Sequence, residues 1–355
     1  MAAKPTDELR AALIIAGGRG TRFWPASRGA RPKPLFSPDD KSTLIADTIA
    51  RHQPLISRER IFVLVPAEQR DVFARALEGV IPPSNLLVEP QGRGTTVAIA
   101  YGWAIIRERL GEVMLAVTPA DHYVTPGSGF RRTLGQAFAL ARRRSAIVVI
   151  GVTPTRADSG YGYMKIGPAA GVGFKVERFV EKPAPALART MVRSGKYLWN
   201  AGMFVMSGET LASELAEHCP ALSKIIQKSD GAAAANLARA YGKLKLDAFD
   251  REVVEKSAHI FGVRASFRWH DVGSWHGLWE ALRDSGGNAL MGNVMALDSE
   301  GVLARGGERL IVLLGVEDLV VVDDADAILV ARRSRSQDVR RVIEELERRR
   351  LHRYL

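Results

Sequence analysis

The chain has 355 residues, of which 46% are hydrophobic and 25% charged, a composition typical of globular proteins. No apolar run approaches the roughly 20 residues that a membrane-spanning helix requires, so we expect no membrane partner. The formal net charge of +11 favours anionic ligands, but it does not distinguish a nucleotide from a nucleic acid.

The N-terminus and the cysteine content indicate a compartment. The N-terminal stretch MAAKPTDELR is polar and lacks the apolar core of a secretory signal, and Cys219 is the single cysteine. A single thiol excludes an intrachain disulfide and suits a reducing compartment, so we expect a cytoplasmic protein. The arginine clusters at 142–144 and 348–350 are interpreted as surface charge rather than a nucleic-acid patch.

Short apolar runs alternate with helical patterns through residues 1–285. The strands are expected at ALIIA, IFVLV, NLLVE, VMLAV, AIVVIGV, FKVERFV, MFVMS and HIFGVRA. The helices between the first four strands are expected near 43–51, 68–77 and 95–110. This alternation predicts an α/β domain of Rossmann-like type with a mixed, mainly parallel sheet.

Residues 286–355 have a different pattern and predict a second, smaller domain. Short strands follow one another there, separated by Gly, Asp and Glu, with no room for crossover helices. The closing stretch SRSQDVRRVIEELERRR predicts a helix, with Ser334 and Gln337 spaced as a capping box. Its expected apolar face consists of Val339, Val342, Ile343 and Leu346. The length of the chain agrees with two domains, because one hydrophobic core rarely extends over so many residues.

Glycines follow the first strand directly, at positions 17, 18 and 20. In a doubly wound sheet this turn lies at the ligand crevice, where glycine backbone amides can approach phosphate oxygens. Side chains that can add donors are Thr21, Arg22 and Lys33. The turn lacks the third glycine of a dinucleotide fingerprint, where Phe23 stands, and the Gly-Lys-Ser/Thr of a Walker A loop. A glycine turn without a ligand remains an alternative, which Arg22 and PKPL make less favourable.

The stretch GGRGTRFWPASRGARPKPL at 17–35 closely resembles the signature of the sugar-nucleotide pyrophosphorylases, and FWPASR resembles the mannose-1-phosphate guanylyltransferase branch. Further matches follow in the family's order: EPQGRGT, PADH, GYGYMKIG, FVEKP, WNAGMF, FDREVVEK and WHDVGSW. The resemblance extends over nearly the whole chain. It implies a nucleotidyltransferase that joins GTP to a sugar 1-phosphate, here α-D-mannose 1-phosphate, and a left-handed β-helix in the C-terminal domain.

The implied reaction has an ionised phosphate as its nucleophile, so catalysis is expected to rest on positioning and charge neutralisation rather than on a general base. By resemblance, the catalytic residues are Arg22, Lys33, Asp121, Lys182 and Asp271. Asp121 and Asp271 are the implied ligands of Mg²⁺, which typically takes one or two protein carboxylates. The neighbouring His122 and His270 are interpreted as hydrogen-bonding or packing residues rather than as a transition-metal site.

The resemblance also assigns the two substrates. Lys182 is expected to contact the phosphate shared by sugar and nucleotide. The expected sugar-binding residues are Gly162, Glu181 and Asn200, with Tyr161 beside them and Asp250 and Glu255 only suggested. The expected nucleotide-binding residues are Gly17, Gly18, Gly20, Thr21, Glu89, Pro90, Gly92, Arg93 and Thr95. The chain departs from the family at Gly94, where the usual residue is Asn, so the preference for guanine is less secure than the reaction type.

Three alternatives stay open on the sequence. The first is a nucleotidyltransferase for another sugar 1-phosphate, such as a heptose. The second is a catalytically silent regulatory subunit, against which the intact Arg22, Lys33, Asp121, Lys182 and Asp271 argue. The third, a nucleic-acid-binding protein, is favoured only by the net charge, and we expect no nucleic acid as partner. The oligomeric state is also open, a homodimer being one option.

Overall fold

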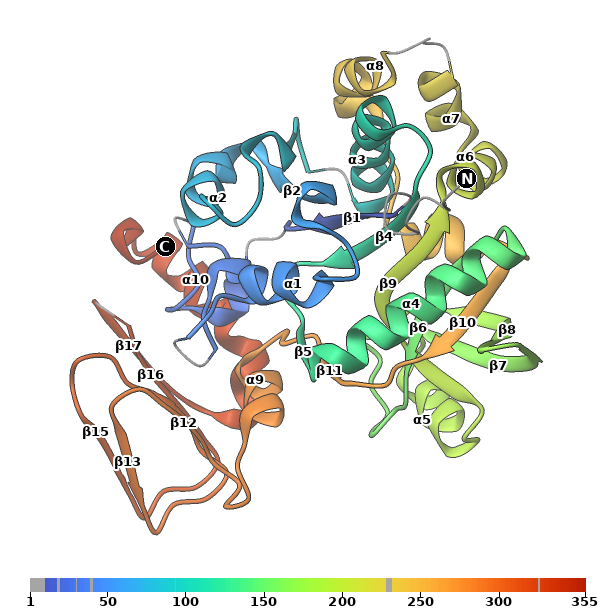
Figure 1. Ribbon diagram of the computed structural model, residues 1–355. Coiled ribbons are helices and arrows are strands. Elements are labelled where there is room, and N and C mark those ends of the chain that lie inside the picture. The colour runs from blue at the N-terminus through green and yellow to red at the C-terminus, as the bar shows by residue number, and fades with distance from the viewer. Residues whose placement is uncertain are drawn as a thin grey trace.

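The computed structural model describes residues 10–17, 20–29, 31–38, 41–92, 94–227, 232–324 and 326–355. These residues form a large α/β domain and a small β-rich domain that lies against it (Figure 1). The described part of the chain contains no helix that is long and apolar enough to cross a membrane.

A mixed nine-stranded sheet forms the centre of the large domain, in the order β3-β2-β1-β4-β9-β6-β10-β8-β7. The strands β1 to β4 are parallel to one another, β9 runs antiparallel between β4 and β6, and β7 and β8 form a hairpin. The bounds are β1 Arg10–Ile15, β2 Ile61–Pro66, β3 Leu86–Glu89, β4 Met114–Pro119, β6 Ile147–Val152, β7 Tyr163–Ala170, β8 Gly173–Val180, β9 Tyr197–Ser207 and β10 Ile260–Arg264.

Helices cover both faces of this sheet, which explains why its central strands are apolar throughout rather than alternating. Leu13 and Ile14 of β1 are both fully buried but belong to two different core clusters, one on each face. The helices are α1 Leu44–His52, α2 Arg70–Ala76, α3 Thr95–Leu110, α4 Gly127–Arg144, α5 Pro185–Arg193, α6 Gly208–His218, α7 Pro220–Gln227 and α8 Ala233–Ala240. The predicted α/β sandwich is therefore confirmed.

The predicted helices agree closely with the observed ones. The helix expected at 95–110 is α3, and α1 begins one residue later than expected because Thr43 is its N-cap and accepts a hydrogen bond from the Ala46 amide at 3.3 Å. The helix expected near 68–77 is shorter, since Ala67–Gln69 forms a 3₁₀ turn before α2. The stretch FDREVVEK forms a π-helix at Asp250–Val254.

The small domain has the parallel, coiled strand arrangement of a β-helix. Strands β12 Ala289–Met291, β14 Leu303–Arg305 and β16 Leu319–Asp324 stack in parallel, and β13 Val294–Leu297 pairs in parallel with β15 Ile311–Leu314 on a second side. Strand β17 Ala327–Arg332 is antiparallel to β16 and ends the first sheet. The expected β-rich C-terminal domain is thus present. The helix α9 Trp275–Leu282 leads into it.

The predicted capping box at the last helix is wrong. Residues Arg333–Val339 form a 3₁₀ helix, and α10 Arg340–Arg348 begins only after it, so Ser334 lies inside a helical turn instead of before one. Gln337 does not cap the helix, because its side-chain oxygen accepts a hydrogen bond from Arg22 instead. The predicted apolar face does pack inward: Val339 is buried in a core cluster that also contains Trp275, Leu303 and Val320, and the partly buried Val342, Ile343 and Leu346 pack against this cluster.

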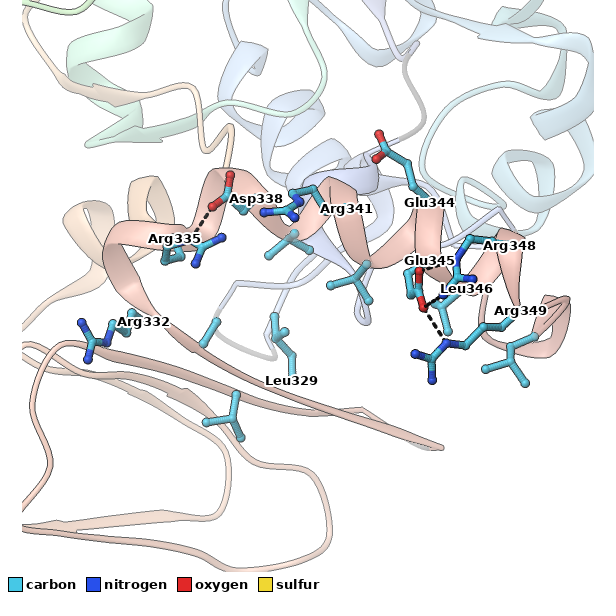
Figure 2. A pocket seen from close by; sticks show the side chains of 15 residues that line it. Leu329, Arg332, Arg335, Asp338, Arg341, Glu344, Glu345, Leu346, Arg348 and Arg349 are labelled. Atoms are coloured by element: carbon cyan, nitrogen blue, oxygen red, sulfur yellow. Dashed lines mark hydrogen bonds and ion pairs between the residues drawn. The ribbon is translucent and has the colours of Figure 1, made fainter.

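A groove of about 1000 Å³ lies between β17 and the 333–349 segment (Figure 2). Leu329 and Leu346 line it together with arginines such as Arg332 and Arg341. This groove belongs wholly to the small domain and is separate from the cleft described next.

Candidate functional site

The cleft of interest opens at the carboxyl ends of β1 and β4, where ligands bind in sheets of this type. Its volume is about 320 Å³. Its lining includes many of the residues that the sequence predicts for the site: Gly17, Thr95, Asp121, Tyr161, Gly162, Glu181, Lys182, Asn200, Asp250 and Asp271.

Lys33 joins three segments that are far apart in the sequence. It lies in the 3₁₀ turn Lys33–Leu35 and its side chain is only 10% exposed. Its ammonium group donates to Asp121 Oδ2 at 2.7 Å and to the backbone oxygen of Asp271 at 2.9 Å. The two aspartates also approach each other because Tyr123–Thr125 and Arg268–His270 pair as short antiparallel strands, β5 and β11. The structure therefore brings Lys33, Asp121 and Asp271 together.

Asp121 is held in its charged form. Burial alone would raise its pKa, but the charge of Lys33, the electrostatic contribution of His122 and the hydrogen bonds to the carboxylate together outweigh burial, and the pKa lies below its ordinary value. Its neighbour His122 is different, since burial lowers the pKa of that imidazole to about 4. The neutral ring accepts a hydrogen bond at Nδ1 from Trp269 Nε1 at 3.0 Å. His122 is thus a packing and hydrogen-bonding residue, as predicted.

Asp271 is fixed by its own loop and by Tyr161. Its Oδ1 accepts hydrogen bonds from the Tyr161 hydroxyl at 3.0 Å and from the Gly273 amide at 3.1 Å. Burial and the nearby carboxylate raise the pKa of Tyr161, so the phenol keeps its proton and remains a donor. The next residue, Val272, has φ 45°, an unusual left-handed conformation for a β-branched side chain. Such strain is frequent where a loop must hold a functional group in place.

The carboxylates fit a magnesium ion better than a transition metal. Within the described ranges, no group of three or more His, Cys, Asp or Glu is placed to hold a metal. Mg²⁺ needs fewer protein ligands, because phosphate and water oxygens complete its octahedron. An ionised Asp121 beside Asp271 in one cleft is a donor set of that kind.

The sugar side of the cleft is formed by the end of β8 and the middle of β9. Lys182 has φ 49°, and its Nζ lies 3.5 Å from Glu181 Oε1. Gly162 is required beside them, because a Cβ there would lie 2.5 Å from Glu181 Oε2. The Asn200 side-chain amide donates to Asp250 Oδ1 at 2.5 Å, and its backbone amide donates to the Gly162 carbonyl at 2.8 Å.

Two carboxyl groups of this side have pKa values above their ordinary values. Burial, with a further contribution from Asp250, raises the pKa of Glu181 to about 7. Burial also raises the pKa of Asp250. A carboxyl group that is ionised in part can accept or donate a hydrogen bond, which suits a ligand rich in hydroxyl groups.

The loop after β3 is only in part a lining of the cleft. Thr95 lines it, and its Oγ1 accepts a hydrogen bond from the Phe249 amide at 2.9 Å. Glu89, Pro90 and Gly92 lie outside the lining; Glu89 is buried and accepts a hydrogen bond from the Tyr241 hydroxyl at 2.6 Å. Burial raises the pKa of Glu89.

Gly94 has a structural explanation in this chain. Its φ is +90°, and a Cβ there would lie 2.8 Å from the Leu246 carbonyl oxygen and 3.0 Å from that of Asp247. The Thr96 hydroxyl donates to the same Asp247 carbonyl at 2.7 Å. The 246–249 segment therefore occupies the space that the family's usual Asn side chain would need.

The glycine turn is described in part. Gly17 lines the cleft, and Gly20 has φ 59° and packs so closely against Ser27 and Lys33 that a side chain there would collide with both. Arg22 is exposed, lies outside the cleft lining, and donates to Gln337 Oε1 at 3.2 Å. Gly18, Arg93 and the side chain of Thr21 lie outside the described residues.

Sequence reasoning missed two aromatic residues of the site. Trp269 packs edge-on against Tyr161, with ring centroids 5.2 Å apart, and also holds His122. Tyr241 holds Glu89. Trp269 opens the motif WHDVGSW and was therefore within reach of a closer interpretation, whereas Tyr241 stands in no motif and gave no signal.

Comparison with known proteins gives matches to both parts of the chain. Residues 11–286 match the model of the family described as nucleotidyl transferase, and residues 292–346 match a MannoseP isomerase/GMP-like beta-helix domain. The chain is 36% identical over 343 residues to xanthan biosynthesis protein XanB of Xanthomonas campestris pv. campestris, covering 94% of this chain and 73% of that protein. It is 34% identical over 349 residues to a mannose-1-phosphate guanylyltransferase of Escherichia coli, covering 94% and 73%.

A solved structure is also similar over nearly its whole length. The crystal structure of a mannose-1-phosphate geranyltransferase from Thermus thermophilus superposes with a TM-score of 0.87 at 34% identity. The match covers 96% of this chain and 99% of that one, and so includes both domains.

Proposed function

The chain belongs to the nucleotidyl transferase family, and we propose that it is a mannose-1-phosphate guanylyltransferase, which joins GTP and α-D-mannose 1-phosphate to give GDP-mannose and pyrophosphate. One observation carries this proposal. A single cleft contains Asp121 and Asp271, which Lys33 contacts through one carboxylate and one backbone oxygen, together with the group of Lys182, Glu181 and Asn200.

The proposed step is an in-line displacement at phosphorus. An oxygen of the sugar phosphate forms a bond to the α-phosphorus of GTP, and the bond from that phosphorus to the bridging oxygen of pyrophosphate breaks. The nucleophile is already ionised, so no proton has to be removed. The protein must therefore align two polyanions and offset their charge.

Cations and backbone amides are the groups that perform this task. The amides of the glycine turn after β1 are assigned to the phosphates, and Lys33 packs against Gly20 of that turn while it holds Asp121. Lys182 is assigned to the phosphate shared by sugar and nucleotide. Arg22 is assigned to the leaving pyrophosphate, which requires it to exchange its contact with Gln337 for a phosphate oxygen.

Asp121 and Asp271 are the residues that would hold Mg²⁺. The ion, when bound, supplies positive charge that neutralises phosphate oxygens. The chain's own contribution is to keep Asp121 ionised through Lys33, and to fix Asp271 through Tyr161 and Gly273.

The sugar is recognised in this proposal by the buried polar groups of β8 and β9. Each hydroxyl that leaves water needs a partner, and Glu181, Asn200 and the Gly162 backbone supply donors and acceptors close together. Asp250 adds a further carboxyl group through Asn200.

The experiment that tests the proposal is a matrix of pyrophosphate-release assays. Five nucleoside triphosphates are combined with mannose, glucose and heptose 1-phosphates in the presence of Mg²⁺, and the highest kcat/KM is expected for GTP with mannose 1-phosphate. A different best pair would correct the substrate and keep the reaction. Absence of turnover with every pair, together with a raised Tm on adding GTP, would favour a silent regulatory subunit.

The cytoplasmic location and the homodimer remain parts of the proposal. GTP is a cytoplasmic substrate, which favours that location. For the dimer, the small domain exposes Leu314 of β15 and Val330 of β17, at 66% and 64%, and Val330 also lines the groove in Figure 2. Burial of such side chains by a second copy would favour association. Light scattering of wild type and Val330→Asp is the test, and a monomeric wild type would remove the dimer.

A further inference from the structure

The loop that carries the glycine turn and Lys33 is held by the small domain as well as by the large one. Arg31 makes a two-pronged ion pair with Asp324, with Nη1–Oδ1 at 3.1 Å and Nη2–Oδ2 at 2.7 Å. Arg28 Nη2 lies 2.7 Å from Asp326 Oδ1. Asp324 ends β16, and Asp326 directly precedes β17. Two aspartates at the connection between β16 and β17 therefore bind two arginines of the loop after β1.

These ion pairs are partly removed from water. Asp324 is 8% exposed, and the Arg28 side chain is 9% exposed. A two-pronged contact of arginine with carboxylate fixes direction as well as distance. Loss of the Asp326 carboxylate would leave the buried Arg28 guanidinium without its carboxylate partner, whereas Arg31, at 49% exposed, would lose its two-pronged anchor while staying partly in water.

Apolar contacts hold the same loop. The rings of Phe23 and Phe36 pack against Trp275, with centroids 4.8 Å and 5.8 Å away, in the core cluster that also contains Leu303 and Val320 of the small domain. The Trp24 indole donates to the Tyr354 carbonyl oxygen at 2.7 Å. The loop is therefore seated in the interface between the domains.

A short covalent path leads from these contacts to the cleft. Only Pro32 separates Arg31 from Lys33, and proline restricts the backbone between them. Lys33 in turn contacts Asp121 and the Asp271 backbone. A displacement of Arg31 would therefore be transmitted to Lys33 and to the glycine turn packed on it.

We propose that Asp324 and Asp326 are positioning residues for the nucleotide, through which the small domain sets the place of the 20–35 loop relative to the cleft. The inference rests on the proposed function insofar as it names GTP as the ligand. It predicts an effect on the nucleotide side. The sugar-side residues Glu181 and Lys182 directly follow β8 and Asn200 lies in β9, all in the large domain, whereas both acids hold the loop after β1.

The adjacent residue provides a matched control. Asp323 lies on the same strand and makes a two-pronged contact with Arg309, Nε–Oδ2 at 3.1 Å and Nη2–Oδ1 at 2.5 Å, that stays within the small domain. Its side chain is 7% exposed. Asp323→Asn and Asp324→Asn therefore remove one carboxylate charge each from an arginine pair with a buried acid, and only Asp324→Asn releases the loop.

Steady-state kinetics form the first arm of the test. Asp324→Asn is expected to raise the KM for GTP about tenfold, the scale of a lost charge-assisted contact, and to leave the KM for the sugar 1-phosphate within about twofold. Asp323→Asn is expected to keep both constants within about twofold. Equal effects of the two variants on GTP, or an equal effect of Asp324→Asn on both substrates, would overturn the positioning role.

Hydrogen exchange forms the second arm and needs no turnover. Amides of residues 20–36 are expected to exchange faster in Asp324→Asn than in wild type, and to be unchanged in Asp323→Asn. Unchanged exchange in Asp324→Asn overturns the inference even if the enzyme is active. Absence of activity in wild type refutes the proposed function instead, and the exchange comparison still decides whether the small domain holds the loop.

Discussion

Lys33 and Asp121 form an ion pair of 2.7 Å that joins the loop after β1 to the turn after β4. The lysine side chain is 10% exposed and the aspartate 28% exposed, so water screens the pair less than it would at the surface. Because the same ammonium also binds the Asp271 backbone oxygen, Lys33 ties Asp121 and the Asp271 backbone to the loop after β1.

Replacing this lysine is expected to remove most of the activity. In Lys33→Met the cation near the phosphates is lost and Asp121 loses its ion-pair partner, so we expect kcat/KM to fall by on the order of 100-fold or more. The control is Lys165→Met, which breaks a 2.6 Å ion pair with Glu177 on the exposed β7–β8 hairpin. Pyrophosphate release measures both variants, and a Lys33→Met enzyme as active as Lys165→Met would contradict the role of Lys33.

The carboxylate of Asp121 is expected to be required for activity and not for folding. Asp121→Asn keeps the shape of the side chain but removes its charge, so we expect a folded protein with kcat lowered by on the order of 1000-fold. In wild type, Mg²⁺ with GTP should raise the Tm, and in the variant this increase should shrink. Full turnover by Asp121→Asn would exclude its assignment to the metal.

Lys182 is expected to act on the sugar phosphate more than on the nucleotide. It has a left-handed backbone conformation and lines the cleft next to Glu181 at the end of β8. Lys182→Met should therefore raise the KM for mannose 1-phosphate by about tenfold or more and change GTP binding less. Lys256→Met, which removes a 2.8 Å surface pair with Glu252, is the control. Equal losses for both substrates would argue against this placement.

The sequence predicted individual helices and strands better than it predicted which distant residues come together in the fold. The helix expected at 95–110 has the bounds of α3, and Gly111 follows its last residue. The convergence of Lys33, Asp121 and Asp271 could not be derived from spacing, since a sheet with crossovers brings distant segments together; only the resemblance to a family suggested it. The motifs identified the candidate site residues. The order of the strands in the sheet determines how these residues lie relative to one another.

The contacts between the two domains could not be predicted from local sequence patterns. Gln337 was interpreted as part of a capping box because its spacing from Ser334 is that of a helix start, but in the fold it accepts from Arg22. Asp324 and Asp326 gave no signal at all, because acids between short strands are typical of turns. In the fold, Gln337, Asp324 and Asp326 each contact a residue that is far away in the sequence instead of a local partner.

Glu181 is expected to make stability depend on pH. Its pKa is raised from 4.5 to about 7, so the folded state binds a proton more tightly than the unfolded state, and this stabilisation is present at low pH and lost as pH rises through 7. Glu181→Gln should lie within about 1 kcal/mol of wild type near pH 5, just above the unfolded-state pKa, and should exceed its free energy of unfolding at pH 8 by on the order of 2–3 kcal/mol.

Urea unfolding at pH 5, 6, 7 and 8 measures this difference. Glu177→Gln is the control on the same strand, where the carboxylate is 42% exposed in a surface pair, and a change under about 1 kcal/mol is expected. A difference between Glu181→Gln and wild type that stays constant from pH 5 to pH 8 would refute the raised pKa.

Restoring the family's usual residue at position 94 is expected to harm this chain. A Cβ at Gly94 would lie 2.8 Å from the Leu246 carbonyl oxygen, so Gly94→Asn must displace the 246–249 segment. That displacement breaks the hydrogen bonds from the Thr96 hydroxyl and to the Thr95 hydroxyl, and it moves Asp250 away from Asn200. We expect a loss of on the order of 1–3 kcal/mol in the free energy of unfolding and a higher KM for both substrates.

Gly79→Asn is the control that separates the effect of a steric collision from the effect of a positive φ. Gly79 also has a positive φ, of +73°, but a Cβ there meets nothing within 4 Å. Asparagine tolerates positive φ better than most residues, so a cost below about 1 kcal/mol is expected. Denaturant unfolding and GTP kinetics of both variants test this prediction. Equal stability of the two variants would mean that contact with the 246–249 segment is not the reason for glycine at position 94. A Gly94→Asn enzyme with improved GTP use would show that the family's Asn still fits the base site.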